Sequence, residues 1–123
     1  MTFNTIETPT RMRGLSVLSH SVANKGGTFD RLGNVVTTGV AVTVKVLDTI
    51  EGRCIEADEL AGHLTFSLGE GAYLGTWWDE ENDRWEISET AVFRCREDAL
   101  VVGKMLGERY VYDIDTDDCL AVA

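Results

Sequence analysis

The stretch that decides the fold reads Ala72-Tyr73-Leu74-Gly75-Thr76-Trp77-Trp78-Asp79-Glu80-Glu81-Asn82-Asp83-Arg84-Trp85-Glu86-Ile87. Within it, an acidic run over residues 79–83 separates two segments that are rich in aromatic and β-branched residues. This pattern is typical of a β-hairpin whose connection has four or five residues. We therefore expect two antiparallel strands here, and the return strand should run from Arg84 to about Phe93.

Upstream of the hairpin, valines at every second position indicate another strand. The run from Val35 to Leu47 has valine at positions 40, 42, 44 and 46. Because side chains alternate along a strand, we expect these four valines on one buried face. Further elements are expected as follows: a strand over residues 14–22, a turn over residues 48–52 and a short helix over residues 57–64.

Downstream of the hairpin, the residues predict one helix and two short strands. Glu97-Asp98 suits the first turn of a helix, and Gly107 suits the position just after its end. Leu100 and Leu106 should lie on the buried stripe of this helix. The strands that follow are expected over residues 110–114 and 119–123, with an acidic turn between them.

These elements predict an α+β fold, in which a mainly antiparallel sheet carries one C-terminal helix and one short central helix. The chain has 123 residues, of which 44% are hydrophobic, and this suits one domain with its own core. We expect a single domain over residues 1–123, with residues 1–13 flexible. No apolar run approaches the length of a membrane-spanning helix, and the N-terminal residues show no signal pattern. We therefore expect a cytoplasmic protein without membrane association.

The net charge of −10 is distributed unevenly along the chain. Residues 1–50 carry five basic and three acidic residues, whereas residues 51–123 carry six basic and eighteen acidic ones. An acidic surface repels the phosphate backbone, so duplex nucleic acid is not an expected partner. The acidic residues could serve solubility alone, or they could offer a negative face to a basic protein, including one whose normal ligand is nucleic acid.

The cysteines and aspartates do not predict a metal site. Cys54, Cys95 and Cys119 lack the close ligand pairs of zinc sites, so we expect reduced thiols. The run Asp113-x-Asp115-x-Asp117 resembles the opening of a calcium-binding loop, but Asp118 stands where the loop needs glycine. We expect a solvated acidic turn, and neither a metal nor another cofactor.

Constellations that would support catalysis are also missing from the sequence. His20 lies between Ser19 and Ser21, and successive residues of a strand point to opposite faces of a sheet. His63 lies between apolar residues of the predicted short helix, where we expect it to pack. The sequence has no nucleophile elbow, phosphate-binding loop or two-histidine zinc helix. It therefore favours a protein that is not an enzyme.

Four segments in the second half of the chain, taken in order, form one sequence pattern: Tyr73 to Asp79, Ala91-Val92-Phe93, Arg96 to Leu100, and Tyr110 to Ile114. Over residues 73–123 this pattern resembles small uncharacterised accessory proteins of tailed phages that infect actinobacteria. Those proteins usually have Asn-Gln near the helix end, where this chain has Gly107-Glu108. The resemblance implies a phage accessory protein that acts in the cytoplasm of the host cell.

The acidic hairpin is the first candidate site. Loop tips often display binding residues. Trp77 and Trp78 must face opposite sides of the sheet, so we expect one of them in the core and the other outside it. The leading hypothesis is a non-catalytic protein of the anti-defence type that occupies a basic host protein. Its predicted partner-binding residues are Asp79, Glu80, Glu81, Asp83 and Trp78.

The alternative hypothesis is a module that sequesters a small phosphorylated, nucleotide-type signal, either alone or as a homodimer. Arg94 and Arg96 stand where a strand meets a helix N-terminus, so both guanidinium groups could face one anion. They could equally pair with Glu97, Asp98 or the acidic hairpin. The predicted ligand-binding residues are Arg94, Arg96, Arg109 and Trp77.

Overall fold

The computed structural model describes residues 8–51 and 55–122. In chain order, its elements are α1 (Thr8–Asn24), β1 (Gly26–Phe29), β2 (Val40–Glu51), α2 (Ala57–Gly62), the π-helical turn η2 (His63–Ser67), β3 (Tyr73–Asp79), β4 (Arg84–Phe93), α3 (Arg96–Met105), β5 (Tyr110–Asp113) and β6 (Asp118–Ala121). The described strands form one antiparallel sheet in the order β1-β3-β4-β2-β5-β6. The predicted α+β class with a mainly antiparallel sheet is confirmed.

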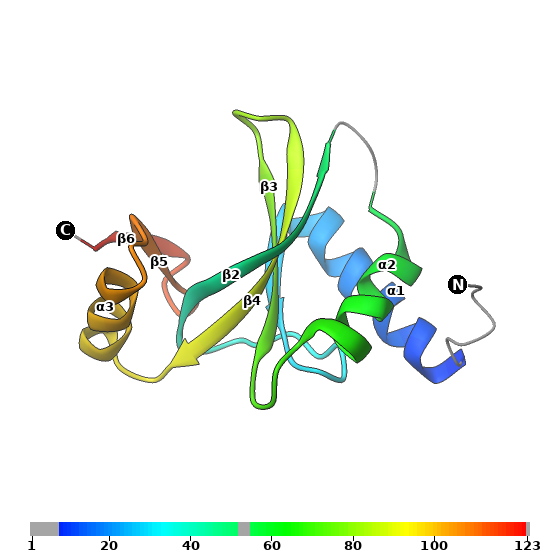
Figure 1. Ribbon diagram of the computed structural model, residues 1–123, viewed down its shortest axis with the longest axis horizontal. Coiled ribbons are helices and arrows are strands. Elements are labelled where there is room, and N and C mark those ends of the chain that lie inside the picture. The colour runs from blue at the N-terminus through cyan, green and yellow to red at the C-terminus, as the bar shows by residue number, and fades with distance from the viewer. Residues whose placement is uncertain (1–7, 52–54, 123) are drawn as a thin grey trace.

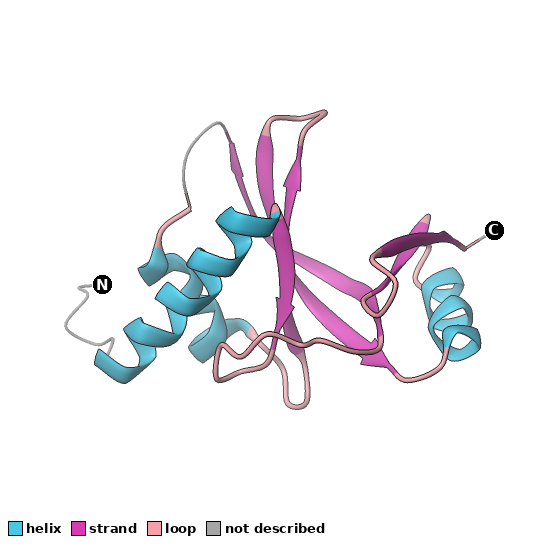
Figure 2. Ribbon diagram, turned by 180° about the vertical axis from the view of Figure 1, so that it is seen from behind, coloured by secondary structure: helices cyan, strands magenta, loops and turns pink. Residues whose placement is uncertain are grey.

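The helices gather at the two ends of this sheet. Helices α1 and α2 lie together at one end, and α3 lies beside β5 and β6 at the other (Figure 1). Seen from behind, β2 and β4 run between the two ends (Figure 2). The long strands therefore connect two regions of packing.

The hairpin that the sequence predicted is confirmed, and β4 has the predicted limits. Trp78 of β3 is paired with Trp85 of β4, and their ring centroids lie 5.5 Å apart. Aromatic pairs at this distance stabilise a hairpin beyond the area that they bury. The pair fixes the register just below the acidic turn.

Residues 14–22 form part of α1, so the predicted strand is wrong. At Gly14 this helix approaches α2 closely. A Cβ atom at position 14 would lie 2.2 Å from the carbonyl oxygen of Ala57. We expected residues 1–13 to be flexible. Residues 8–13 form the first turns of the same helix, and residues 1–7 lie outside the described residues.

Helix α1 is also fixed to the sheet by a buried polar contact. Ser21 is fully buried, and its hydroxyl is hydrogen-bonded to the hydroxyl of Thr76 at 2.6 Å. One turn earlier, Val17 is buried on the same side of the helix. Tertiary packing, and not local propensity, decides the conformation of this segment.

Strand β2 begins later and ends later than predicted, and its valines do not share one buried face. Val40 and Val42 are buried, whereas Val44 and Val46 are 39% and 50% exposed. The register of β2 against β4 shifts between Thr43 and Lys45 and again after Val46. Each shift inserts an extra residue and reverses the alternation beyond it, which explains the difference.

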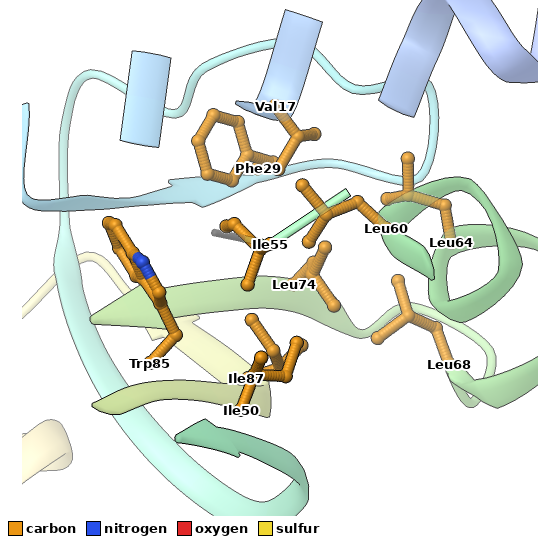
Figure 3. Packing of buried hydrophobic residues seen from close by; sticks show 10 residues of the cluster. All are labelled: Val17, Phe29, Ile50, Ile55, Leu60, Leu64, Leu68, Leu74, Trp85 and Ile87. Carbon is orange, nitrogen blue, oxygen red and sulfur yellow. The ribbon is translucent and has the colours of Figure 1, made fainter. Parts of the chain in front are cut away.

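Among the described residues, the buried hydrophobic side chains form two separate clusters. The larger one lies under α1, α2 and η2 (Figure 3) and contains Val17, Phe29, Ile50, Ile55, Leu60, Leu64, Leu68, Leu74, Trp85 and Ile87. The smaller one lies under α3 and contains Val40, Val42, Ala99 and Val111.

Helix α3 has nearly the predicted limits, and Gly107 follows it with a φ of 74°. Its buried stripe differs from the prediction, because Ala99 and Gly103 are the buried residues and Leu106 is exposed. A Cβ atom on Gly103 would lie only 2.8 Å from Val111. Leu100 packs partly against the smaller cluster. The helix thus approaches β5 through its small residues.

Candidate functional site

The acidic turn between β3 and β4 carries three exposed carboxylates, on Glu80, Glu81 and Asp83. Asp79 differs from them, because it is only 6% exposed. Its two carboxylate oxygens accept hydrogen bonds from the backbone N–H and the side-chain amide of Asn82, at 3.2 and 2.7 Å. The amide of Asn82 is the main cause that lowers the pKa of Asp79. Asp79 therefore holds the turn together, and the structure does not display it for a partner as predicted.

The end of α1 meets this turn through Lys25, a residue that the sequence analysis did not single out. The ammonium Nζ of Lys25 lies 2.7 Å from Oε1 of Glu80, and this contact raises the pKa of Lys25 and lowers that of Glu80. The carbonyl of Lys25 accepts a hydrogen bond from the backbone N–H of Trp78. The two partners are more than fifty positions apart, so no local pattern could have indicated the contact.

The two adjacent tryptophans face opposite sides of the sheet, as predicted, but Trp78, which we expected to bind the partner, is the one that is mostly covered. Trp78 packs against Trp85 and the larger cluster, so most of its surface is unavailable to a partner. Trp77 is 53% exposed on the other face. A shallow hollow of about 350 Å³ lies beside it. The lining residues of this hollow are Lys25, Trp77, Trp78, Asp79, Glu80 and Glu81.

The structure does not bring together the four residues expected to bind an anionic ligand. Trp77 is paired with Glu86, and Arg94 lies eight residues beyond Glu86, which corresponds to roughly 26 Å along an extended strand. Arg96 and Arg109 flank opposite ends of α3. Any anion contacted by Arg94 is therefore out of reach of Trp77.

Arg96 forms an internal ion pair instead of a free anion clamp. Its Nε and one terminal nitrogen both donate to Oδ2 of Asp113, each at 2.7 Å. The side chain of Asp113 is almost fully buried, so this pair joins the start of α3 to β5. The partner is none of the acidic residues that the sequence analysis considered for Arg96.

The aspartates at and before the turn between β5 and β6 make separate internal contacts. Asp113, Asp115 and Asp117 each have a different partner. Asp113 binds Arg96, as described above. Asp115 accepts hydrogen bonds from the hydroxyl of Thr38 at 2.7 Å and the backbone N–H of Gly39 at 3.1 Å. Asp117 accepts one from the hydroxyl of Tyr112. Since these carboxylates diverge, they do not form the ligand set of a calcium loop.

Tyr112 should ionise at a higher pH than an ordinary tyrosine. Burial, the hydrogen bond to Asp117 and nearby carboxylates raise the pKa of Tyr112 to about 12 from an ordinary 10. Because the folded state favours the neutral phenol, its stabilising contribution is complete below pH 10 and is lost as the pH rises toward 12. We expect Tyr112→Phe to remove the late component from a phenolate absorbance titration and to flatten the loss of stability in this range. A wild-type titration without a phenolate component well above pH 10 would contradict this assignment.

Within the described residues, no group of three or more His, Cys, Asp or Glu is arranged to hold a metal ion. Cys95 and Cys119 are free thiols. Cys54 lies outside the described residues.

A pair of contacts that links Ser67, His63 and Asp48 was also missed in the sequence analysis. The hydroxyl of Ser67 lies 2.9 Å from Nδ1 of His63, and Nε2 of His63 lies 3.6 Å from Asp48. His63 and Ser67 are four positions apart, a spacing that brings side chains together on a helix. The sequence analysis missed their contact because its predicted helix ended at Leu64. Ser67 ends η2, where backbone carbonyls and not N–H groups are exposed, so a developing oxyanion would find no support there. The contacts of Ser67, His63 and Asp48 therefore connect η2 to β2, and these three residues do not have the features of an acyl-transfer site.

Comparison with models of known protein families, with curated proteins and with solved structures found no match to this chain. In the described residues, no helix is both long and apolar enough to cross a membrane.

Proposed function

We propose that this chain is a non-catalytic binding protein that occupies a basic host protein through the tip of its β3–β4 hairpin. The observation that carries the proposal is the half-exposed indole of Trp77 beside the carboxylates of Glu80 and Glu81. We further propose, from the sequence resemblance, a phage accessory role in the host cytoplasm of the anti-defence type.

The charges at the tip favour a basic partner. Glu80, Glu81 and Asp83 are all exposed, and the chain as a whole carries −10. Exposed charges of one sign accelerate the encounter with an oppositely charged protein, because their field acts over about 8–10 Å at ordinary salt. The acidic tip thus supplies steering toward the partner.

Trp77 adds a contact that solubility alone does not require. An exposed indole face attracts a lysine or arginine cation, and neighbouring carboxylates strengthen this preference. The hollow beside Trp77 is lined by both kinds of group. A basic side chain of the partner would therefore find an aromatic face and a carboxylate together.

Lys25 already makes the kind of contact that the proposal requires. Its ammonium lies 2.7 Å from Glu80, although both side chains are about 70% exposed. Such exposed ion pairs contribute little to stability, so a partner's cation can replace Lys25 at low cost. The hairpin itself is held in place by the Asp79–Asn82 contacts and by the Trp78–Trp85 pair.

Neutralising the tip should slow association with a basic partner. We expect the combined variant Glu80→Gln, Glu81→Gln and Asp83→Asn to bind an arginine-rich peptide with a lower association rate and a flatter salt dependence, because rim charges act mainly on encounter. Trp77→Ala should instead accelerate dissociation about fivefold, which corresponds to a cation–π contribution of about 1 kcal/mol. Stopped-flow fluorescence at several salt concentrations measures both rates.

The matched control removes the same charge elsewhere. Glu70, Asp98 and Asp118 are exposed and lie away from the hairpin tip. The variant Glu70→Gln, Asp98→Asn and Asp118→Asn should keep most of the association rate. If both triple variants slow association equally, net charge alone explains binding and the hairpin site is rejected.

A further inference from the structure

A second concave region lies at the opposite end of the same hairpin. It is a groove of about 660 Å³, within the size range of small-molecule sites. The start of β3, the end of β4 and the segment before β2 form its walls. Its lining residues are Asp30, Val36, Thr38, Gly39, Tyr73, Val92, Phe93 and Arg94.

The walls of the groove are largely apolar and partly aromatic. Tyr73, Phe93 and the valines at positions 36 and 92 are half-buried, so each keeps some surface available. Tyr73 is paired with Thr90 and so lies on the same face of the sheet as Val92, whereas Phe93 is paired with Val40 and packs against the smaller cluster. Tyr73 therefore supplies the aromatic surface of the groove, which favours a flat, apolar occupant.

The two carboxylates at the groove, those of Asp30 and Asp115, accept hydrogen bonds from internal donors. Asp30 accepts hydrogen bonds from the backbone N–H groups of Leu32 and Asn34 and from the side chain of Asn34. Asp115, just behind the lining residues, accepts from Thr38 and Gly39. Both oxygens of each carboxylate therefore already accept an internal hydrogen bond, although each group keeps its negative charge.

Arg94 is the opposite case. Its guanidinium is exposed, and it has no ion pair or side-chain hydrogen bond to any residue within 8–51 and 55–122. The hydroxyl of Tyr73 likewise has no partner in that part of the chain. The unsatisfied groups of the groove are thus one fixed cation and one neutral donor, which suit an anion.

The shape of the groove is set by the backbone at Gly39. This residue has a φ of 108°, and a Cβ atom there would lie 2.7 Å from Val92 and 2.9 Å from the carbonyl of Phe93. Its own carbonyl accepts a hydrogen bond from the N–H of Ile114 at 2.9 Å. The groove is therefore formed before any ligand arrives, which lowers the cost of binding.

We propose that this groove binds a small aromatic molecule with a single anionic group. The ring lies against Tyr73 and the neighbouring valines, and a carboxylate or phosphate accepts hydrogen bonds from Arg94. One anionic group is specified because Arg94 is the only cation among the described residues that line the groove, and the chain carries −10 overall, so a polyanion is repelled. The site is separate from the hairpin tip and does not depend on the function proposed for that tip.

The test uses indole-3-acetate as a probe, with indole and acetate as its two halves. In two-dimensional amide NMR spectra of the full chain, millimolar indole-3-acetate should shift the signals of Thr38, Gly39, Phe93 and Arg94. Indole or acetate alone should cause much smaller shifts. Arg94→Gln should weaken binding of the probe about tenfold, because a hydrogen bond to a charged group is lost.

The matched variant is Arg109→Gln, which removes an exposed arginine outside the groove. It should leave the affinity for the probe unchanged. Equal weakening by both variants, equal shifts with indole alone, or shifts centred on Trp77 would each overturn the proposal. None of these results would bear on the binding of an arginine-rich peptide by the hairpin tip, so the two proposals fail independently.

Discussion

Replacement of Phe29 by alanine is expected to lower the free energy of unfolding by about 3–5 kcal/mol. Phe29 is completely buried in the larger cluster, where it lies beside Val17 (Figure 3). The edge of the His20 ring also packs against it, with ring centroids 5.4 Å apart. Removal of the ring leaves a cavity between α1 and the sheet that neither can fill. Urea denaturation followed by tryptophan fluorescence measures the loss.

The matched control is the same substitution at an exposed position. Phe66 of η2 is 64% exposed, so Phe66→Ala should cost under about 1 kcal/mol. A similar loss for both variants would mean that Phe29 is not part of the core and that β1 is wrongly placed.

Gly14→Ala should destabilise the protein by about 2–3 kcal/mol, although alanine is the better helix former. The added methyl group would lie 2.2 Å from the carbonyl oxygen of Ala57 and 3.0 Å from the Cβ atom of Ala61. Since the first of these is a backbone atom, the clash is relieved only if α1 and α2 move apart. The midpoint of urea denaturation should fall without a change in its slope.

Gly62→Ala is the same substitution at another position, and we expect it to change the free energy of unfolding in the opposite direction. Gly62 has helical backbone angles, and a Cβ atom there would meet nothing within 4 Å. Alanine should therefore stabilise the protein by about 0.5–1 kcal/mol. Gly14→Ala would contradict the observed packing of α1 on α2 if it stabilised the protein as Gly62→Ala does.

The sequence predicted correctly where local chemistry decides the structure. The β3–β4 hairpin needs only two aromatic strands and a polar turn, and the limits of β4 agree with the prediction. Helix α3 was found from its acidic first turn and from Gly107, which adopts the expected positive φ. These signals depend on neighbours within a few residues.

The wrong predictions concern segments whose structure is decided by contacts with residues far away in the sequence. The β-branched and polar residues of 14–22 indicate a strand, but this segment is a helix that packs on α2 at Gly14 and on the sheet through Val17 and Ser21. The alternation of valines in β2 is interrupted after Val42 by a register shift that depends on β4. Neither the partner helix nor the partner strand can be read from the local pattern.

The candidate site was predicted in part, for the same reason. The acidic turn was located correctly, yet the sequence did not distinguish the buried Asp79 from its exposed neighbours. Alternation showed that Trp77 and Trp78 face opposite sides but not which side is covered, because helix α1 was not anticipated there. Arg94 and Arg109 are separated because α3 lies between them, and the sequence had predicted the length of this helix.

The separation of the buried residues into two clusters has a consequence for amide hydrogen exchange. Between the clusters, β2 passes through Val44 and Val46, which bury little. The region of α3, β5 and β6 rests on the smaller cluster, so it can open locally while the larger one stays intact. Its amides should then exchange through such local openings, ahead of those in β3 and α1. Asp115 belongs to this region and holds Thr38 and Gly39, so the wall of the groove beside Arg94 is supported by the part of the molecule that opens first.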